Sequence, residues 1–135
     1  MSRIVSTPLG SGRTRIVHEE TASEISTDVS PEFGGGGSTF SSTDLVAAAL
    51  GSCISSSLEA LAERAGIPFD AIAIAVSKEL GTSPKRISRL EVDITVDAPY
   101  DEKTARLFER AAHTCTVHRS LHPDIDAPIA VVFTG

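Results

Sequence analysis

The sequence contains very few aromatic and sulfur-containing residues. Its 135 residues include no tryptophan, one tyrosine, one methionine and two cysteines. Two cysteines, Cys53 and Cys115, are too few for the disulfide framework that holds small secreted domains together. The chain must therefore fold around an ordinary aliphatic core, which one domain of this length can bury. We expect a single domain over residues 1–135.

Positive charge is also scarce. The chain has 12 Lys and Arg residues against 18 Asp and Glu residues, so its net charge is −6. Nucleic acids and anionic membranes bind basic surfaces. The nearest basic group, formed by Lys85, Arg86 and Arg89, is more typical of a solvated edge. We therefore expect neither nucleic acid nor membrane as a partner.

The sequence also lacks long apolar runs. No segment reads as the roughly 20 consecutive apolar residues of a membrane span. The residues Met1–Val5 lack the apolar region of a signal peptide. These absences predict a cytoplasmic protein, in which a cysteine pair consists of buried thiols, metal ligands or redox groups.

β-branched segments predict strands in the first third of the chain and again beyond the middle. Two turns, at Gly10–Gly12 and Glu20–Ala22, separate the first three strands. The last strand follows Pro128, which ends the irregular segment before it. The expected strands are Ile4–Thr7, Arg15–Glu19, Ser23–Val29, Ala71–Glu79, Arg89–Asp97 and Ile129–Phe133.

Four successive glycines, residues 34–37, interrupt this pattern. Such a run cannot hold regular structure cheaply. A flexible linker is one interpretation, but Phe33 and Phe40 bracket the glycines and free linkers rarely carry aromatic residues. An ordered loop that brings the backbone close to another group is the favoured interpretation.

A long helix is predicted to begin near Ser42 or Thr43 and to continue to Ala65, because Gly66 is a typical helix stop. From Leu45 to Ile54 the residues are apolar or small on every side, which indicates a helix buried all round. A single chain with so few layers is too small to cover such a helix, so we expect a homodimer.

A second helix is expected to begin at Asp101 and to place five residues on one side: Leu107, Phe108, Ala111, Ala112 and Cys115. A short helical turn is expected near Val117–Leu121. The resulting order, βββ-α-ββ-α-β, predicts an α+β fold.

Chemistry, if present, should involve Cys53 and Cys115. Buried free cysteines commonly pack as small hydrophobic residues, and that alternative stays open. However, His113, His118 and His122 crowd around Cys115 together with Arg119, and a nearby cation lowers the pKa of a thiol.

Two other kinds of site are less well supported. The histidines and Cys115 have the residue types of a zinc site, but their spacing matches no zinc signature, so no metal and no cofactor are expected. Residues Gly51–Ile54 lack the G-x-S-x-G elbow of a hydrolase.

Three segments resemble one known family. The segment from Ser42 to Cys53, STDLVAAALGSC, is similar to the central helix of the OsmC/Ohr family of osmotically inducible and organic-hydroperoxide-resistance proteins. Cys115 to Leu121, CTVHRSL, resembles the second cysteine motif of that family, which usually reads Cys-Pro-Val and continues into a short helix. The glycine-rich segment from Pro31 to Phe40 resembles the approach to the central helix.

This resemblance implies an intertwined α+β homodimer of antiparallel sheets around a long buried helix. It also implies a thiol peroxidase that reduces organic hydroperoxides. Cys53 would attack the peroxide and become a sulfenic acid, and Cys115 would capture it as a disulfide. A dithiol reductant, often a lipoyl group, would reset the pair.

The family pattern is incomplete in this chain. Peroxidase members carry a glutamate ten residues before the first cysteine, where this sequence has Thr43; Asp44 is adjacent. Arg13, in a glycine turn, resembles the arginine that pairs with that glutamate, and Thr116 replaces the usual proline. The resemblance therefore gives Cys53, Cys115, Arg13 and Asp44 as the catalytic set. The alternative is a weakly active or non-enzymatic protein that binds an apolar molecule or senses redox state through the same cysteines.

Overall fold

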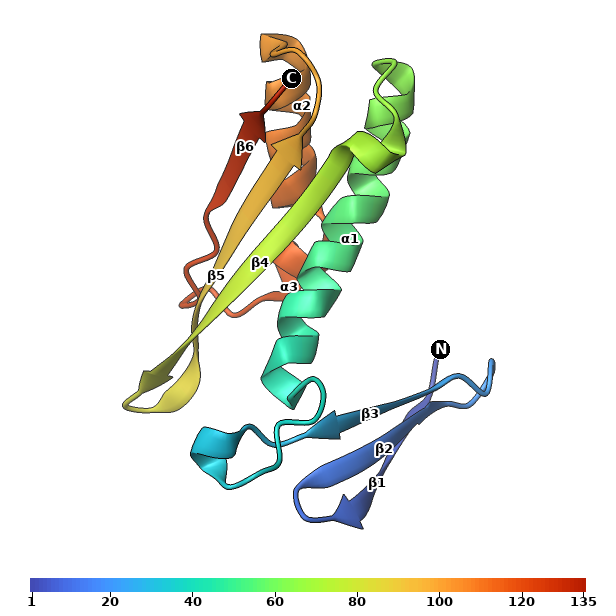
Figure 1. Cartoon of the computed structure of the whole chain (residues 1–135), viewed down its shortest axis with the longest axis vertical. Coiled ribbons are helices and arrows are strands. Elements are labelled where there is room, and N and C mark those ends of the chain that lie inside the picture. Colours follow the sequence, from blue (N-terminus) through green and yellow to red (C-terminus); the bar gives the residue numbers. More distant parts are fainter. The chain divides into compact units, whose positions relative to one another are not determined.

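All 135 residues are described by the computed structural model, which consists of two units, residues 1–46 and 47–135. The predicted α+β class and element order are confirmed, with a separate short helix after the second cysteine (Figure 1). The single-domain assignment stays a prediction. The elements are β1 (Ile4–Gly10), β2 (Arg13–His18), β3 (Glu24–Asp28), the 3-10 turn η1 (Pro31–Phe33), α1 (Ser42–Arg64), the 3-10 turn η2 (Phe69–Ala71), β4 (Ile72–Thr82), β5 (Lys85–Val96), α2 (Glu102–Thr114), α3 (Thr116–Ser120) and β6 (Ile129–Phe133).

The first unit is built on a three-stranded antiparallel sheet in the order β1-β2-β3. Both turns lie where the sequence predicts them. Ser11 and Ala22 have φ angles of 56° and 59°, the left-handed conformation that tight turns require. The sheet is therefore held by local hairpins, each formed from residues close in sequence.

The glycine-rich segment is an ordered loop, and the linker interpretation is wrong. The buried carboxylate of Asp28 accepts hydrogen bonds from the Ser38 amide at 3.1 Å, from the Ser38 hydroxyl at 2.7 Å and from the Gly36 amide at 3.4 Å. A Cβ on Gly35 would lie 1.8 Å from the carbonyl oxygen of Val29, so only glycine fits there. Hydrogen bonding by Ser38 lowers the pKa of Asp28 and keeps this anchor ionised.

The second unit contains a three-stranded sheet in the order β4-β5-β6. β4 and β5 form a long antiparallel hairpin, whereas β6 runs parallel to β5. The expectation of wholly antiparallel sheets is therefore wrong for this pair. The reason is topological. α2 and α3 lie between β5 and β6 in the sequence and return the chain to the end of the sheet where β5 begins, so β6 runs parallel to β5.

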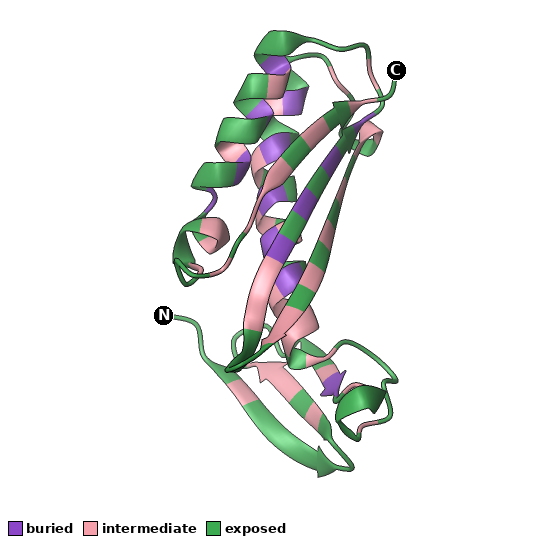
Figure 2. Ribbon diagram, turned by 90° about the vertical axis from the view of Figure 1, so that its left-hand side faces the viewer, coloured by how far each residue is buried: buried purple, intermediate pink, exposed green.

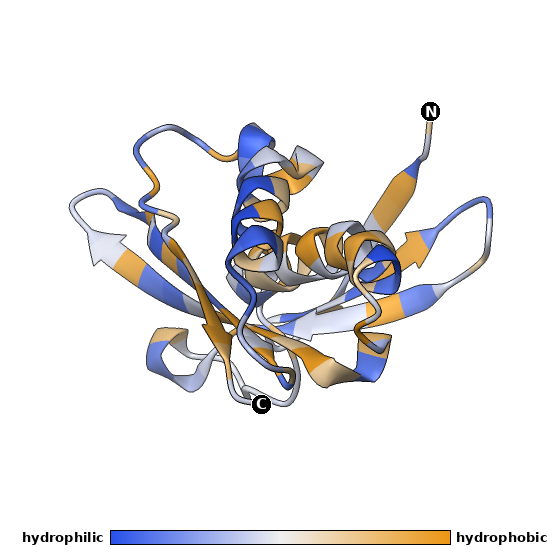
Figure 3. Ribbon diagram, turned by 90° about the horizontal axis from the view of Figure 1, so that it is seen from above, coloured by the Kyte–Doolittle hydropathy of each residue, from blue (hydrophilic) through white to orange (hydrophobic).

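The core of the second unit lies between this sheet and the helices that cover one of its faces (Figures 1 and 3). Along β5 buried and exposed residues alternate, as in a sheet with one covered face (Figure 2). A Cβ on Gly51 of α1 would lie 3.4 Å from Cγ2 of Val76 on β4, so α1 packs directly on the sheet. Fully buried core residues are Leu50, Ile54, Leu58, Ala62, Leu90, Val92, Ile94, Val96, Phe108 and Ala112.

α1 is not buried on all sides of the single chain, contrary to the expectation from its sequence. Its buried residues recur every third or fourth position, which defines one stripe, and Ala48, Ala49 and Ser52 are exposed on other sides. Small apolar residues occupy positions that polar residues usually fill. The difference arises because the sheet can cover only one side of the helix.

The same composition makes α1 long and apolar enough to cross a membrane by length and hydropathy alone, so the expectation that no segment would qualify is wrong on those criteria. A core helix of a globular protein passes the same test. Within this chain 22% of the most apolar window of α1 is buried, and the buried stripe packs on the sheet.

The fold predicts unequal costs for two truncations in the same sheet. Ile94 on β5 is fully buried, whereas Val132 on β6 is 54% exposed. Ile94→Ala should lower the free energy of unfolding by about 2–5 kcal/mol, because it removes buried apolar groups and leaves a cavity. Val132→Ala should cost less than about 1 kcal/mol. Urea unfolding monitored by circular dichroism measures both, and equal losses would contradict this account of the core.

Candidate functional site

The two cysteines lie together in the second unit. Cys53 projects from α1 and is half-buried, whereas Cys115 lies between α2 and α3 and is 4% exposed. Both thiols are free, and each lies close enough to shift the pKa of the other. Residues far apart in the sequence thus bring two nucleophilic atoms near each other.

Cys115 is not part of the second helix, contrary to the sequence-based expectation. α2 ends at Thr114, and Cys115 has φ −64° and ψ 148°, an extended conformation. Its sulfur instead caps α3 by accepting a hydrogen bond from the His118 amide at 3.3 Å. The change in backbone direction at Cys115 separates the two helices and lets α3 begin beside Cys53.

The first turn of α3 lies beside the two sulfurs. The backbone N–H of His118 donates to the Cys115 sulfur at 3.3 Å, and the Val117 and Thr116 amides lie close enough to Cys53 to lower its pKa. The first helical i→i−4 hydrogen bond follows, from the Arg119 amide to the Cys115 carbonyl at 3.0 Å. First-turn amides have no partner within their own helix, and for His118 the Cys115 sulfur supplies the acceptor.

This arrangement gives the two thiols different acidities. The hydrogen bond from the Val117 amide is the largest of the effects that lower the pKa of Cys53; the Cys115 thiol and the Thr116 amide add to it, while burial opposes them. Burial raises the pKa of Cys115, and the neighbouring Cys53 adds to the increase. Cys53 is therefore the thiol of the pair that ionises at lower pH.

The sequence predicted that a histidine or arginine cation would lower the pKa of a thiol. Within residues 47–135, backbone amides lower the pKa of Cys53 instead. The Nε2 atom of His118 donates to the Ala127 carbonyl at 3.2 Å, and its ring packs edge-on against His113 with centroids 5.3 Å apart. His122 accepts a hydrogen bond from the Asp124 amide at 3.0 Å. No three metal-ligating side chains converge anywhere in the structure.

Arg13 and Asp44 belong to the first unit, where each has a partner of its own. Arg13 is the first residue of β2 and pairs in register with Asp28, whose pKa it helps to lower. Asp44 and Ser41 form a reciprocal cap at the start of α1: the Ser41 amide donates to Asp44 at 2.9 Å, and the Asp44 amide donates to the Ser41 hydroxyl at 3.1 Å. The cap residue is therefore Ser41, neither Ser42 nor Thr43. Catalytic roles for Arg13 and Asp44 stay predictions.

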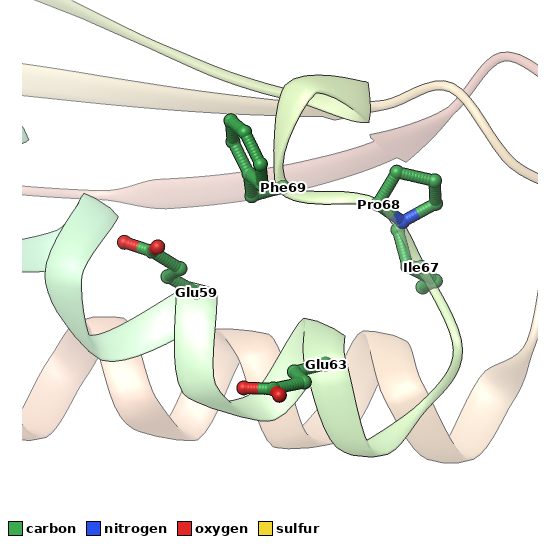
Figure 4. A pocket seen from close by; sticks show the side chains of 5 residues that line it. All are labelled: Glu59, Glu63, Ile67, Pro68 and Phe69. Carbon is green, nitrogen blue, oxygen red and sulfur yellow. The ribbon is translucent and has the colours of Figure 1, made fainter.

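A separate cavity of about 340 Å³ lies where α1 ends and the chain turns toward β4 (Figure 4). Two carboxylates from α1 and three apolar residues from the following turn line it. Neither cysteine is among the lining residues, so this cavity is distinct from the thiol pair. The residues are Glu59, Glu63, Ile67, Pro68 and Phe69.

Residues 35–129 match the family model described as OsmC-like protein. The chain belongs to the OsmC/Ohr family. Among solved structures, it is 33% identical to a candidate osmotic-stress-induced and detoxification-response protein from Psychrobacter arcticus, with a TM-score of 0.89 over 97% of this chain and 96% of that one. A search of curated proteins finds no match.

Two more distant structures share the fold of this OsmC/Ohr protein. An organic hydroperoxide resistance protein OsmC from Legionella pneumophila has 14% identity and a TM-score of 0.80, covering 99% of this chain and 97% of that chain. An organic hydroperoxide resistance protein from Elizabethkingia anophelis has 16% identity and a TM-score of 0.79, covering 99% and 96%. These likenesses establish the α+β architecture around a long central helix.

The difference in acidity predicts the order in which the thiols are alkylated. The rate of Cys53 alkylation by iodoacetamide should rise with pH and reach half its maximum at a lower pH than that of Cys115, because the pKa of Cys53 is lowered and that of Cys115 is raised. Cys115 should react more slowly and at higher pH. Peptide mass spectrometry of samples quenched between pH 5 and pH 10 identifies the modified residue. Faster modification of Cys115 would refute the assignment of Cys53 as the nucleophile.

Proposed function

We propose that this OsmC/Ohr protein is a thiol peroxidase that reduces organic hydroperoxides. The observation that carries the proposal is the pair of neighbouring free thiols, in which Cys53 has a lowered pKa and Cys115 a raised one. A thiolate beside a neutral thiol is the arrangement that a two-cysteine peroxidase needs.

In the first step the Cys53 thiolate attacks the terminal oxygen of the hydroperoxide. A bond forms between sulfur and that oxygen while the O–O bond breaks. The organic part leaves as an alkoxide, which takes up a proton and departs as the alcohol. The sulfur is oxidised to a sulfenic acid and the peroxide is reduced.

In the second step Cys115 attacks the sulfur of the Cys53 sulfenic acid. The new S–S bond displaces hydroxide, which leaves as water with the proton of the Cys115 thiol. The contact between the two sulfurs makes this capture faster than a second oxidation to sulfinic acid. A dithiol reductant, such as a lipoyl group, then exchanges with the disulfide and restores both thiols as it is itself oxidised to a disulfide.

An organic peroxide suits the surroundings of Cys53 better than hydrogen peroxide. No charged residue lies on α1 between Leu45 and Leu58, and the exposed side of this stretch is largely alanine and serine. Such a surface favours the apolar part of an organic substrate. Two structural neighbours are named organic hydroperoxide resistance proteins.

The remaining parts of the proposal concern assembly and the polar groups of the first unit. We propose that the protein acts in the cytoplasm as a homodimer, in which a second copy covers the exposed apolar side of α1. Arg13 and Asp44 would then polarise the peroxide or the Cys53 thiolate, in place of the arginine and glutamate of other members.

A second candidate is a weakly active or non-enzymatic protein that binds an apolar molecule or senses redox state through the same cysteines. Thr43 favours it, because a hydroxyl cannot supply the charge of a glutamate at that position. Counting thiols after oxidation separates this candidate from the peroxidase.

Thiol counts and turnover test the peroxidase directly. One equivalent of cumene hydroperoxide should consume both thiols of the wild type within one turnover. Cys53→Ser should lower peroxide consumption by about 100-fold or more, because a serine hydroxyl is not ionised at neutral pH. Cys115→Ser should react once and accumulate Cys53 sulfenic acid, which excess peroxide converts to sulfinic acid.

The control is Ser55→Ala, an exposed substitution on the same helix, which should consume peroxide as the wild type does. Hydrogen peroxide should react more slowly than cumene hydroperoxide. Wild-type protein that keeps both thiols in the presence of either peroxide would contradict the proposal and favour the binding protein. Thiols oxidised only once, without turnover by dihydrolipoamide, would favour the sensor.

A further inference from the structure

The short helix α3 carries the amide that contacts the Cys115 sulfur. It has only five residues, Thr116–Ser120, and helices of this length are not stable on their own. The amide of His118, within this helix, donates to the Cys115 sulfur at 3.3 Å. The position of that donor therefore depends on the contacts that hold α3 against the rest of the second unit.

The ring of His118 attaches α3 to the second sheet. Its Nε2 atom donates to the Ala127 carbonyl at 3.2 Å. The carbonyls on either side, of Asp126 and Pro128, accept hydrogen bonds from amides of β5 at 2.9 Å each. Successive carbonyls of an extended strand point to opposite sides, and β6 is an edge strand, so the Ala127 carbonyl faces away from β5. The ring thus binds an acceptor that the pairing with β5 does not use.

A second contact involves the same ring. His113, in the last turn of α2, packs edge-on against it, with ring centroids 5.3 Å apart and an angle of 83° between the planes. Cys115 lies between α2 and α3 in the chain, and its side chain is buried. The ring of His118 therefore joins α2, α3 and the sheet edge around the residue that carries the buried thiol.

We propose that His118 is a positioning residue for Cys115: its ring holds α3 against the sheet and thereby keeps its own amide on the Cys115 sulfur. This inference rests on the proposed function, in which Cys115 attacks the Cys53 sulfenic acid. In that step the S–S bond forms, the S–O bond breaks, and hydroxide leaves as water with the proton of the Cys115 thiol. The amide donor stabilises the negative charge that the Cys115 sulfur carries as it attacks.

The reaction with one equivalent of DTNB, an aromatic disulfide, tests this role without peroxide. Cys53 attacks the reagent, forms a mixed disulfide and releases one thionitrobenzoate. Cys115 then attacks the Cys53 sulfur, forms the internal disulfide and releases a second thionitrobenzoate. His118→Ala should slow the second release roughly tenfold, because the Cys115 sulfur loses its fixed position, and should change the first release by less than about twofold.

Two further variants separate the hydrogen bond from the bulk of the ring. His118→Gln keeps a side-chain N–H donor for the Ala127 carbonyl, so it should restore most of the rate of the second release. The matched control is His122→Ala. The ring of His122 is exposed and accepts a hydrogen bond from the Asp124 amide, so its loss should leave both releases unchanged.

Three results would overturn the inference. The first is a His118→Ala protein with a wild-type circular dichroism spectrum whose second release is as fast as that of the wild type. The second is a His118→Gln protein that is as slow as His118→Ala, and the third is an equal slowing of both releases. The DTNB reaction needs no peroxide, so a wild type that fails to reduce cumene hydroperoxide while the variants show the expected differences would refute the proposed function alone.

A second measurement uses the wild-type chain, so it does not depend on whether the alanine variant folds. Long-range ¹H–¹⁵N correlation spectra of the histidine rings should show a proton on Nε2 of His118, because the Ala127 carbonyl can only accept a hydrogen bond. A His118 ring whose only N–H proton lies on Nδ1 would overturn the inference.

Discussion

The chemistry proposed for this protein depends on the position of the first turn of α3 beside the two cysteine sulfurs. The His118 amide donates to Cys115, and the Val117 and Thr116 amides lower the pKa of Cys53. Because two amides go to Cys53 while burial dominates at Cys115, two chemically identical groups acquire opposite pKa shifts. No charged side chain of residues 47–135 is needed for this difference.

The rest of the second unit positions that contact. Gly51 of α1 lies against Val76 of β4, so this helix packs directly on the sheet two residues before Cys53. The N-cap Asp101 starts α2, and the buried side chain of Phe108 holds that helix in the core. The extended backbone at Cys115 then turns the chain into α3. Each step is set by packing or capping, so the thiol contact is a consequence of the fold.

The sequence predicted the elements better than their ends and their surroundings. Strong local signals, such as Gly66 after α1 and the cap at Asp101, placed both long helices. The burial of α1 was overestimated, because apolar composition shows which sides could be covered and not which sides are. The parallel placement of β6 depends on a tertiary crossover that no local pattern encodes.

At the site, the two cysteines and their pairing could be proposed from sequence, whereas the groups that lower the pKa of Cys53 could not. Every residue except proline carries an N–H, so a backbone donor leaves almost no signature in the sequence. The rings of two nearby histidines are hydrogen-bonded elsewhere. His118 donates to the Ala127 carbonyl, and His122 accepts from the Asp124 amide.

The most direct test of the central claim is peptide mapping of the protein after one equivalent of an organic hydroperoxide, with free thiols blocked and without reductant. The account predicts one disulfide, joining the Cys53 and Cys115 peptides of the same chain. A disulfide between chains, an oxidised Cys115 beside an unmodified Cys53, or two unmodified thiols would contradict it.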